Sequence, residues 1–367
     1  MSHQRLKEKQ IELFNNSIKD KKNIYLDLNY WIDFLKVKNG VKVRNYSSEL
    51  LLTIESLVKE NKVVVPISDI HIYEIYKNSN RDHFDKIIEL FEDISNNICF
   101  VSSEERWNNE IIFSLRILFQ IDDPEKYLFQ ESYTKPFFIK GSLLPDLTKF
   151  EINEQNDLSQ FSDLFLDHIW NMSITKFFKN LDEETRRRFN PFEFENIVTD
   201  RLINGRNDYQ NEYKDFKDLF GKEIWGSLEF FKNKIHDLIM AYFSSYKIGT
   251  SLIGDELFKI PENELSIRIM FLITSAIIES KQFRALPGIS IGSGLHSLKR
   301  WNIKSNYKKS DSFDIMHAKV ALTYCDYFFT EKNLCGLIKD SRLKFDKEFN
   351  VKVFSNPKEG LDIISTI

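Results

Sequence analysis

The chain has 367 residues, of which 42% are hydrophobic and 14% aromatic, and its formal net charge is −4. A chain this apolar can bury a sizeable core, which argues against disorder. The net negative charge argues against a protein coated with basic residues for nucleic acid. The scattered cysteines Cys99, Cys325 and Cys335 exclude a disulfide framework or a zinc module and favour a reducing cytosol.

No segment has the sequence of a membrane anchor. The polar N-terminal segment lacks the apolar core of a signal peptide. A membrane span needs about 20 apolar residues, and the most apolar run, Ile269–Ile278, is much shorter than this. We therefore expect a soluble, cytoplasmic protein.

Short apolar strands alternate with helical patterns in the N-terminal third. The apolar runs predict strands at Asn23–Asp27, Lys62–Pro66 and Ile98–Ser102. The helical spacing of apolar residues predicts helices at Glu49–Lys59, Ser68–Lys77 and Phe84–Ile94. Such alternation is typical of right-handed crossovers and a parallel sheet.

The strand signal disappears from about Glu104 to Phe283 and returns after Pro287. The middle region carries helical patterns at Asp163–Phe178, Phe192–Asn204 and Leu228–Tyr246. After it we predict a loop at Gly288–Gly294, a helix at Ser312–Tyr324, and strands at Tyr327–Thr330 and Val351–Ser355. We therefore expect one α/β domain made of residues 1–103 and 286–367, interrupted by a helical insertion at 104–285.

Four acids fall near the carboxyl ends of predicted strands. Asp27 closes the first strand, and Glu74 lies in the helix after the second. Asp314 lies near the start of the helix before the Tyr327–Thr330 strand, and Glu331 directly follows that strand. Ligands of open parallel sheets bind beyond the carboxyl ends of the strands, so we expect these acids to meet at one edge. Asp326 precedes its strand and belongs to the opposite edge.

Clustered carboxylates repel one another unless a cation neutralises them. Oxygen ligands of this kind suit Mg²⁺ or Mn²⁺, which can hold a phosphate and activate a water. The chemistry implied is hydrolysis of phosphodiester bonds. Each acid alone also has a structural interpretation: Asp27 as a helix N-cap, Glu74 as a surface residue, Asp314 as a partner of the helix dipole.

Three segments resemble motifs of the PIN-domain nucleases. Leu26–Asp33 (LDLNYWID) looks like the opening motif, and Val63–Lys77 looks like the second motif, where a strand leads into a helix bearing an acid. Asp311–Leu334 is similar to the C-terminal PIN segment of large bacterial PIN-like proteins, with Asp-x-x-His-Ala opening a helix before a strand. The resemblance covers roughly half of the chain.

This resemblance implies a PIN-like three-layer α/β/α fold and an Mg²⁺- or Mn²⁺-dependent ribonuclease. It makes Asp27, Glu74 and Asp314 metal ligands, with Glu331 as the fourth acid. It also implies that Asn29 supports Asp27 through hydrogen bonds and that Thr330 supports the end of the last strand. Many PIN proteins are toxins, so the resemblance also implies an antitoxin or another regulatory protein as a partner. Two features depart from the family pattern: a Glu stands in place of the usual Asp at position 331, and the insertion is long.

Two further residues of the last segment have open roles. Asp311, three residues before Asp314, is either an extra metal ligand or a helix N-cap. His317 either orients a carboxylate or contacts substrate, or is a packed helix histidine.

A basic stretch without acids precedes the third acid. We predict that it guides RNA to the acids, because cations neutralise phosphates and aromatic rings stack on bases. A solvated loop is the other interpretation. The residues assigned to this role are Lys299, Arg300, Trp301, Lys304, Lys308 and Lys309.

Several alternatives stay open at this stage. The protein could be a catalytically silent nucleic-acid-binding or scaffold module, and a homodimer is conceivable. A haloacid-dehalogenase-type enzyme needs a second Asp where Asn29 stands. A receiver domain needs a lysine late in the sheet and has no use for Asp314.

Overall fold

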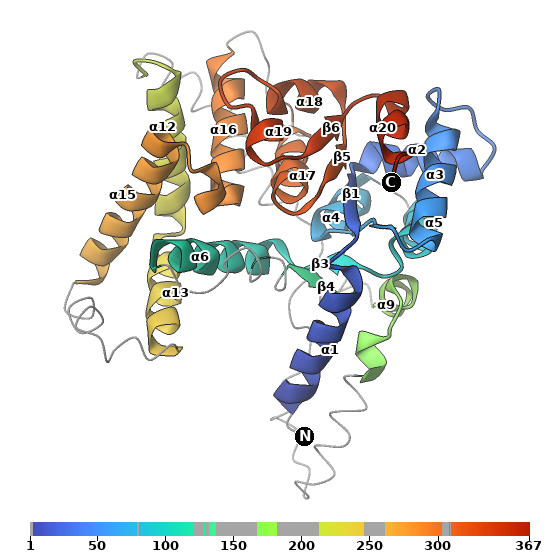
Figure 1. Ribbon diagram of the computed structural model, residues 1–367, viewed down its shortest axis with the longest axis horizontal. Helices are drawn as coiled ribbons and strands as arrows, with labels where there is room; N and C mark the ends of the chain where they lie inside the picture. Colours follow the sequence, from blue (N-terminus) through green and yellow to red (C-terminus); the bar gives the residue numbers. More distant parts are fainter. Residues whose placement is uncertain are drawn as a thin grey trace, which may run out of the picture.

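The computed structural model describes residues 3–78, 81–119, 128, 132–136, 167–181, 213–245, 261–302, 308 and 310–367. Its centre is a parallel sheet of four strands in the order β2-β1-β5-β6. Figure 1 labels β1, β5 and β6 of this sheet. The strands are β1 (Lys22–Leu26), β2 (Val63–Val64), β5 (Tyr327–Phe329) and β6 (Lys352–Phe354). Four of the five predicted strands therefore form the sheet, and the α/β class is confirmed.

The order of the strands reverses between β1 and β5. From β1 the chain passes to β2 on one side, and β5 and β6 are added on the other side of β1. Ile24 lies opposite Tyr327 and Leu26 opposite Phe329, so β1 and β5 end level with each other. Their carboxyl ends therefore frame the type of crevice in which open α/β sheets bind ligands.

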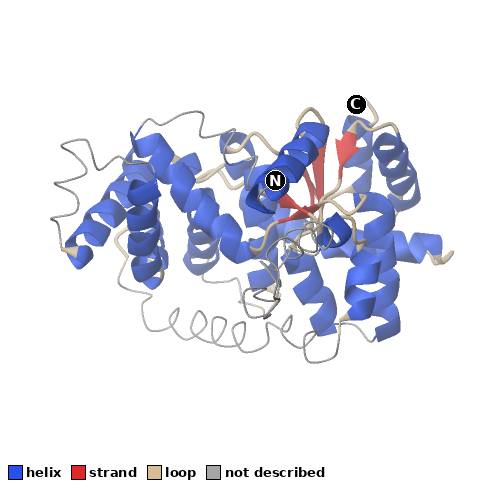
Figure 2. Cartoon of the chain, turned by 90° about the horizontal axis from the view of Figure 1, so that it is seen from below, coloured by secondary structure: helices blue, strands red, loops and turns tan. Residues whose placement is uncertain are grey.

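The strands are buried on both faces. Tyr25 and Phe328 pack into one hydrophobic core, whereas their neighbours Leu26 and Phe329 pack into a second. Side chains alternate between the two faces of a strand, so these cores lie on opposite sides of the sheet. Figure 2 shows the strands with helices on either side. The arrangement is compatible with three α/β/α layers.

Different helices contribute to the two cores. The first core contains residues of α16 (Pro287–Trp301), α17 (Asp311–Tyr324) and α18 (Lys332–Ile338). The second contains residues of α2 (Leu28–Lys38), α3 (Ser47–Lys59), α5 (Arg81–Ser95) and α20 (Pro357–Ile364). The remaining elements on the α/β side are α1 (His3–Ile18), α4 (Asp69–Asn78) and α19 (Phe345–Glu348).

The described part of the middle region is helical apart from one two-residue strand, β4 (Tyr133–Thr134). Its elements are α6 (Ser103–Phe119), α9 (Ile174–Asn180), α12 (Phe216–Phe230), α13 (Lys232–Ser245), α15 (Glu262–Ser280) and a 3₁₀ turn, η4 (Phe283–Ala285). Helix α12 packs on both α15 and α16, and its apolar residues belong to the first core of the sheet. None of the described helices combines the length and apolar character that crossing a membrane requires.

Two helical predictions in this region were too long. Asp163–Phe178 is interrupted before α9, which begins after its N-cap Ser173. Leu228–Tyr246 is divided at Phe231, where α12 ends and α13 begins. The predicted helix at 192–204 lies outside the described residues.

The third predicted strand does not join the parallel sheet. It forms β3 (Cys99–Phe100), which pairs antiparallel with β4 (Tyr133–Thr134). Cys99 also forms an isolated parallel bridge with Ile67, which follows β2 in the chain. The two-residue strand β4 lies in the region predicted to be wholly helical. Its length explains the error, because two residues show no periodicity.

The predicted loop at Gly288–Gly294 is instead the first half of α16. A Cβ atom at Gly288 would lie 2.7 Å from Glu110 Oε2, and one at Gly294 would lie 2.8 Å from Leu343 Cδ1. The glycines therefore allow neighbouring side chains to approach the helix closely, and the prediction confused this packing requirement with a turn.

Candidate metal centre

Asp27 lies at the carboxyl end of β1, facing the end of β5. Its backbone N–H donates to Phe329 O at 2.9 Å. Its carboxylate accepts from Thr330 Oγ1 at 2.8 Å and from the Asn29 N–H at 3.4 Å, which makes Asp27 the N-cap of α2 as well. The side chain is buried. Both predicted supporting residues therefore contact Asp27.

Glu74 and His317 meet beside this carboxylate, from α4 and α17 respectively. His317 Nε2 lies 3.1 Å from Glu74 Oε2, and the imidazole is only 1% exposed. One ligand atom each from Asp27, Glu74 and His317 lies within 4.8 Å of the other two. Residues from three distant parts of the chain thus converge at the edge where strand order reverses.

Asp314 and Glu331 are electrostatically coupled to this group, although the three residues whose ligand atoms lie within 4.8 Å of one another are Asp27, Glu74 and His317. Burial, together with the charges of Asp27 and Glu331, raises the pKa of Asp314 to about 7. Burial and the charge of Asp27 also raise the pKa of Glu331, whose Oε1 accepts from Asn29 Nδ2 at 2.6 Å. Burial and the Glu74 charge likewise raise the pKa of Asp27. The four predicted acids are therefore electrostatically coupled.

His317 is the basic side chain of this group. Burial lowers its pKa, but the hydrogen bond to Glu74 and the charges of Asp27 and Asp314 outweigh burial and raise it. Among the described residues, no lysine or arginine forms an ion pair with Asp27, Glu74, Asp314 or Glu331. The cluster therefore carries excess negative charge that a divalent cation would offset.

The donor set fits a divalent metal ion. Metal–oxygen and metal–nitrogen bonds of about 2.1 Å place two ligands of one ion about 3 to 4 Å apart. The 3.1 Å separation of His317 Nε2 from Glu74 Oε2 lies in this range. Asp27 and Glu74 supply hard oxygen atoms, and His317 supplies a nitrogen.

Asp311 lies apart from this cluster, although it is on the same helix. Its buried carboxylate forms an ion pair with the buried Lys299 and accepts the Lys308 N–H at 2.8 Å. The carboxylate is therefore directed toward the end of α16 and fixes the start of α17. This arrangement favours the structural interpretation of Asp311 over the extra ligand.

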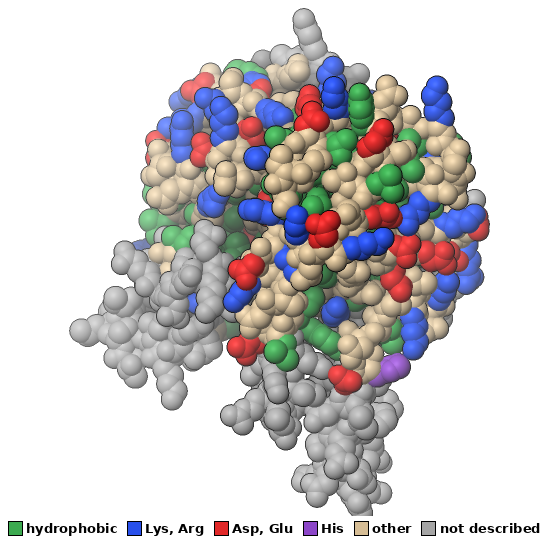
Figure 3. All heavy atoms as spheres, turned by 45° about the vertical axis from the view of Figure 1, so that its right-hand side comes forward, with side chains coloured by type: hydrophobic (Ala, Val, Ile, Leu, Met, Phe, Trp, Pro, Cys, Tyr) green, Lys and Arg blue, Asp and Glu red, His purple; other side chains and the backbone are tan. Residues whose placement is uncertain are grey.

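The same ion pair corrects part of the predicted RNA-binding stretch. Lys299 is 3% exposed, and Arg300 forms an ion pair with Glu223, so neither side chain is presented on an open surface. Trp301 is 42% exposed, and Lys308 is exposed. Lys304 and Lys309 lie outside the described residues. On the face shown in Figure 3, basic side chains are interspersed with acidic ones among the described residues.

Asp326 lies at the opposite edge, as predicted. It accepts from the Asn23 N–H at 2.8 Å and from Lys22 Nζ at 2.7 Å, next to the start of β1. This acid thus joins β1 to β5 at their amino ends.

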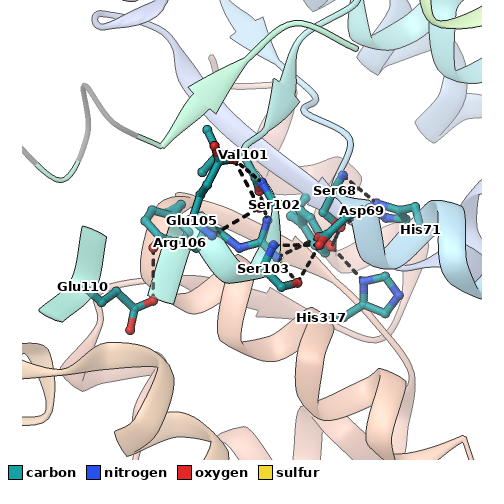
Figure 4. Close-up of polar contacts among 12 residues, drawn as sticks. Ser68, Asp69, His71, Val101, Ser102, Ser103, Glu105, Arg106, Glu110 and His317 are labelled. Carbon is teal, nitrogen blue, oxygen red and sulfur yellow. Dashed lines mark hydrogen bonds and ion pairs between the residues drawn. The ribbon is translucent and has the colours of Figure 1, made fainter. Parts of the chain in front are cut away.

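Three buried residues that were not predicted from the sequence as site residues lie behind the site: Tyr25, Ser68 and His71. Tyr25 OH lies 2.8 Å from His317 Nδ1 and 2.7 Å from Ser68 Oγ, and Ser68 Oγ lies 3.1 Å from His71 Nδ1. Figure 4 shows Ser68 beside His71. One sequence signal exists, because Ser68-x-x-His71 has the spacing of a capping box with His in place of Glu.

Helix α4 is held by a second buried network. Asp69 Oδ1 accepts from Arg106 Nη2 at 2.8 Å, and Asp69 Oδ2 accepts from the backbone and hydroxyl of Ser103, each at 2.7 Å (Figure 4). These bonds tie the first turn of α4 to the start of α6. They fix the helix that carries Glu74.

No protein-family model matches the chain, and no curated protein or solved structure is significantly similar to it.

Proposed function

We propose that this protein is a divalent-metal-dependent endoribonuclease with a PIN-like fold. The convergence of Asp27, Glu74 and His317 at the reversal of strand order carries this proposal. A cluster of raised-pKa acids in a ligand-binding position is typical of a functional site rather than of a structural ion-pair network.

The motif resemblance supports the choice of reaction. The three PIN-like segments contribute Asp27, Glu74 and Asp314; the first two lie within 4.8 Å of each other and of His317, and the charge of Asp27 contributes to the raised pKa of Asp314. The parallel order β2-β1-β5-β6 is compatible with such a fold. RNA as substrate rests on the resemblance alone.

Each residue has a separate task in this proposal. The metal ion would be held by Asp27, Glu74 and His317. Once bound, such an ion can coordinate a phosphate oxygen and lower the pKa of a water molecule. The Thr330 hydroxyl and the Asn29 N–H keep the Asp27 carboxylate in place. Asp314, with a pKa of about 7, can exchange a proton at neutral pH, as a general base must.

The test is cleavage of labelled single-stranded RNA by chelator-treated protein after addition of Mg²⁺ or Mn²⁺. We expect cleavage with metal and its loss in Asp27→Asn. Asp82→Asn is the matched control, because Asp82 is 77% exposed on α5 and forms its ion pair with Lys86. Cleavage that is equal in Asp27→Asn and the wild type would refute the proposal. Absence of cleavage with either metal would favour a nucleic-acid-binding module instead.

A further inference from the structure

The protonation of His317 can be deduced from the buried residues behind it. His71 Nε2 lies 2.7 Å from Leu26 O, and a carbonyl oxygen only accepts, so this nitrogen carries a hydrogen. The Ser68 N–H donates to His71 Nδ1 at 3.1 Å, so that nitrogen carries none. Two backbone groups therefore fix one tautomer of His71. Burial lowers the pKa of His71 well below its usual value, which agrees with a neutral ring.

The direction of each further hydrogen bond follows from this tautomer. Since His71 Nδ1 accepts, the Ser68 hydroxyl donates to it at 3.1 Å. Ser68 Oγ has then used its only hydrogen, so the Tyr25 hydroxyl donates to Ser68 at 2.7 Å. The Tyr25 oxygen in turn accepts from His317 Nδ1 at 2.8 Å. Nδ1 of His317 therefore carries a hydrogen, and Nε2 is the nitrogen that can bind a metal ion in place of the hydrogen that it donates to Glu74.

The other nitrogen of His317 faces the acids. Nε2 lies 3.1 Å from Glu74 Oε2 and within 4.8 Å of a ligand atom of Asp27. A metal-binding histidine almost always donates its second N–H to a fixed acceptor, which sets its orientation and raises its basicity. The Tyr25 hydroxyl is such an acceptor, and it is completely buried.

We propose that His317 Nε2 is a metal ligand, so that this centre binds a divalent transition-metal ion in preference to Mg²⁺. Imidazole nitrogen binds Mn²⁺, Fe²⁺, Co²⁺ or Zn²⁺ better than it binds Mg²⁺, which prefers oxygen and retains its waters. The inference sharpens the metal requirement of the proposed nuclease and rests on the same site. Metal binding can nevertheless be measured whether or not RNA is cleaved.

The most direct readout is pulsed electron paramagnetic resonance of wild-type protein loaded with Mn²⁺. We expect a nitrogen coupling from a directly bound imidazole, and its loss in His317→Gln. His83→Gln is the control, because His83 is a half-buried histidine on α5. Absence of a nitrogen coupling in the Mn²⁺-loaded wild type would overturn the proposal without recourse to any variant.

Calorimetric titration of chelator-treated protein provides the second readout. We expect Mn²⁺ to bind at least about tenfold more tightly than Mg²⁺, and His317→Gln to remove most of this preference. Tyr25→Phe keeps the imidazole but removes its acceptor, so Mn²⁺ affinity should fall by about tenfold with the nitrogen coupling retained. An unchanged Mn²⁺ to Mg²⁺ ratio in His317→Gln would contradict the proposal.

These measurements separate the two proposals. Nitrogen coupling without RNA cleavage supports the metal ligand and refutes the nuclease. Metal-dependent cleavage without nitrogen coupling supports the nuclease and refutes the ligand role of His317.

Discussion

Asp311 and Asp314 lie one turn apart at the start of α17, and their carboxylates have opposite environments. Asp311 forms a buried ion pair with Lys299 and accepts a backbone N–H. Asp314 faces Asp27 and Glu331, and burial with these charges raises its pKa to about 7. The same residue type on the same helix thus anchors the helix at one position and belongs to a coupled cluster of acids, the proposed metal centre, at the other. Which neighbours surround the carboxylate decides its role.

The largest expected effect is the loss of stability when the Asp311 carboxylate, which anchors the start of α17, is removed. Asp311→Asn leaves Lys299 buried without this carboxylate, so we expect it to lower the free energy of unfolding by about 3–5 kcal/mol. Urea unfolding measures this change, with Asp82→Asn as the exposed control. A loss below about 1 kcal/mol would mean that the ion pair does not anchor α17.

The next largest effect is a loss of metal affinity when the hydrogen bond from Thr330 to Asp27 is removed. Thr330→Val removes the hydroxyl that donates to the Asp27 carboxylate at 2.8 Å. Loss of such a supporting hydrogen bond typically weakens metal affinity by about 10- to 100-fold, and we expect this in a Mn²⁺ titration. Thr323→Val is a matched control, since its hydroxyl donates to Lys319 O within α17. Equal losses in both variants would contradict the assignment.

The pH dependence of metal affinity follows from the raised pKa of Asp314. At pH 6 this carboxyl is mostly protonated, and at pH 8 it is mostly ionised, because its pKa is about 7. A bound cation favours the ionised form, so Mn²⁺ should bind on the order of tenfold more tightly at pH 8 than at pH 6. The Asp314→Asn variant should show a smaller dependence. A Mn²⁺ affinity that does not change with pH would contradict a link between metal binding and the ionisation of Asp314.

The smallest effect is a stabilisation. The folded-state pKa of Asp314 is raised, so ionisation costs stability as pH rises from about 4 through 7. Asp314→Asn removes this cost, and we expect metal-free protein to become more stable by about 1–2 kcal/mol at pH 8. The gain should disappear near pH 4. Thermal unfolding in chelator at both pH values tests this, and destabilisation at pH 8 would be the contradicting result.

The sequence was informative where a residue type coincides with the end of a strand. Asp27 and Thr330 follow apolar, β-branched or aromatic runs, so their placement at one edge could be predicted from pattern and the geometry of parallel strands. Asp326 could be assigned to the opposite edge for the same reason. Each of the four strands of the sheet could be predicted because its own segment contains a short apolar run.

The sequence was uninformative where a contact depends on how a helix is rotated. Lys299 was predicted to bind RNA, but it is buried in an ion pair with Asp311. Nothing in the local sequence indicates that Lys299 is buried. The hydrogen bonds from His317 through Tyr25 to Ser68 join three distant segments. Such contacts follow from tertiary packing, which the periodicity of each segment does not specify.

Titration of chelator-treated protein with Mn²⁺ at pH 8 tests the central claim most directly. Asp27 is the most enclosed acid of the cluster and accepts hydrogen bonds that orient it toward Glu74 and His317. We predict saturable binding by the wild type and by Asp82→Asn, and its loss in Asp27→Asn. Failure of the wild type to bind Mn²⁺, or equal binding by Asp27→Asn, would contradict a metal centre at this edge of the sheet.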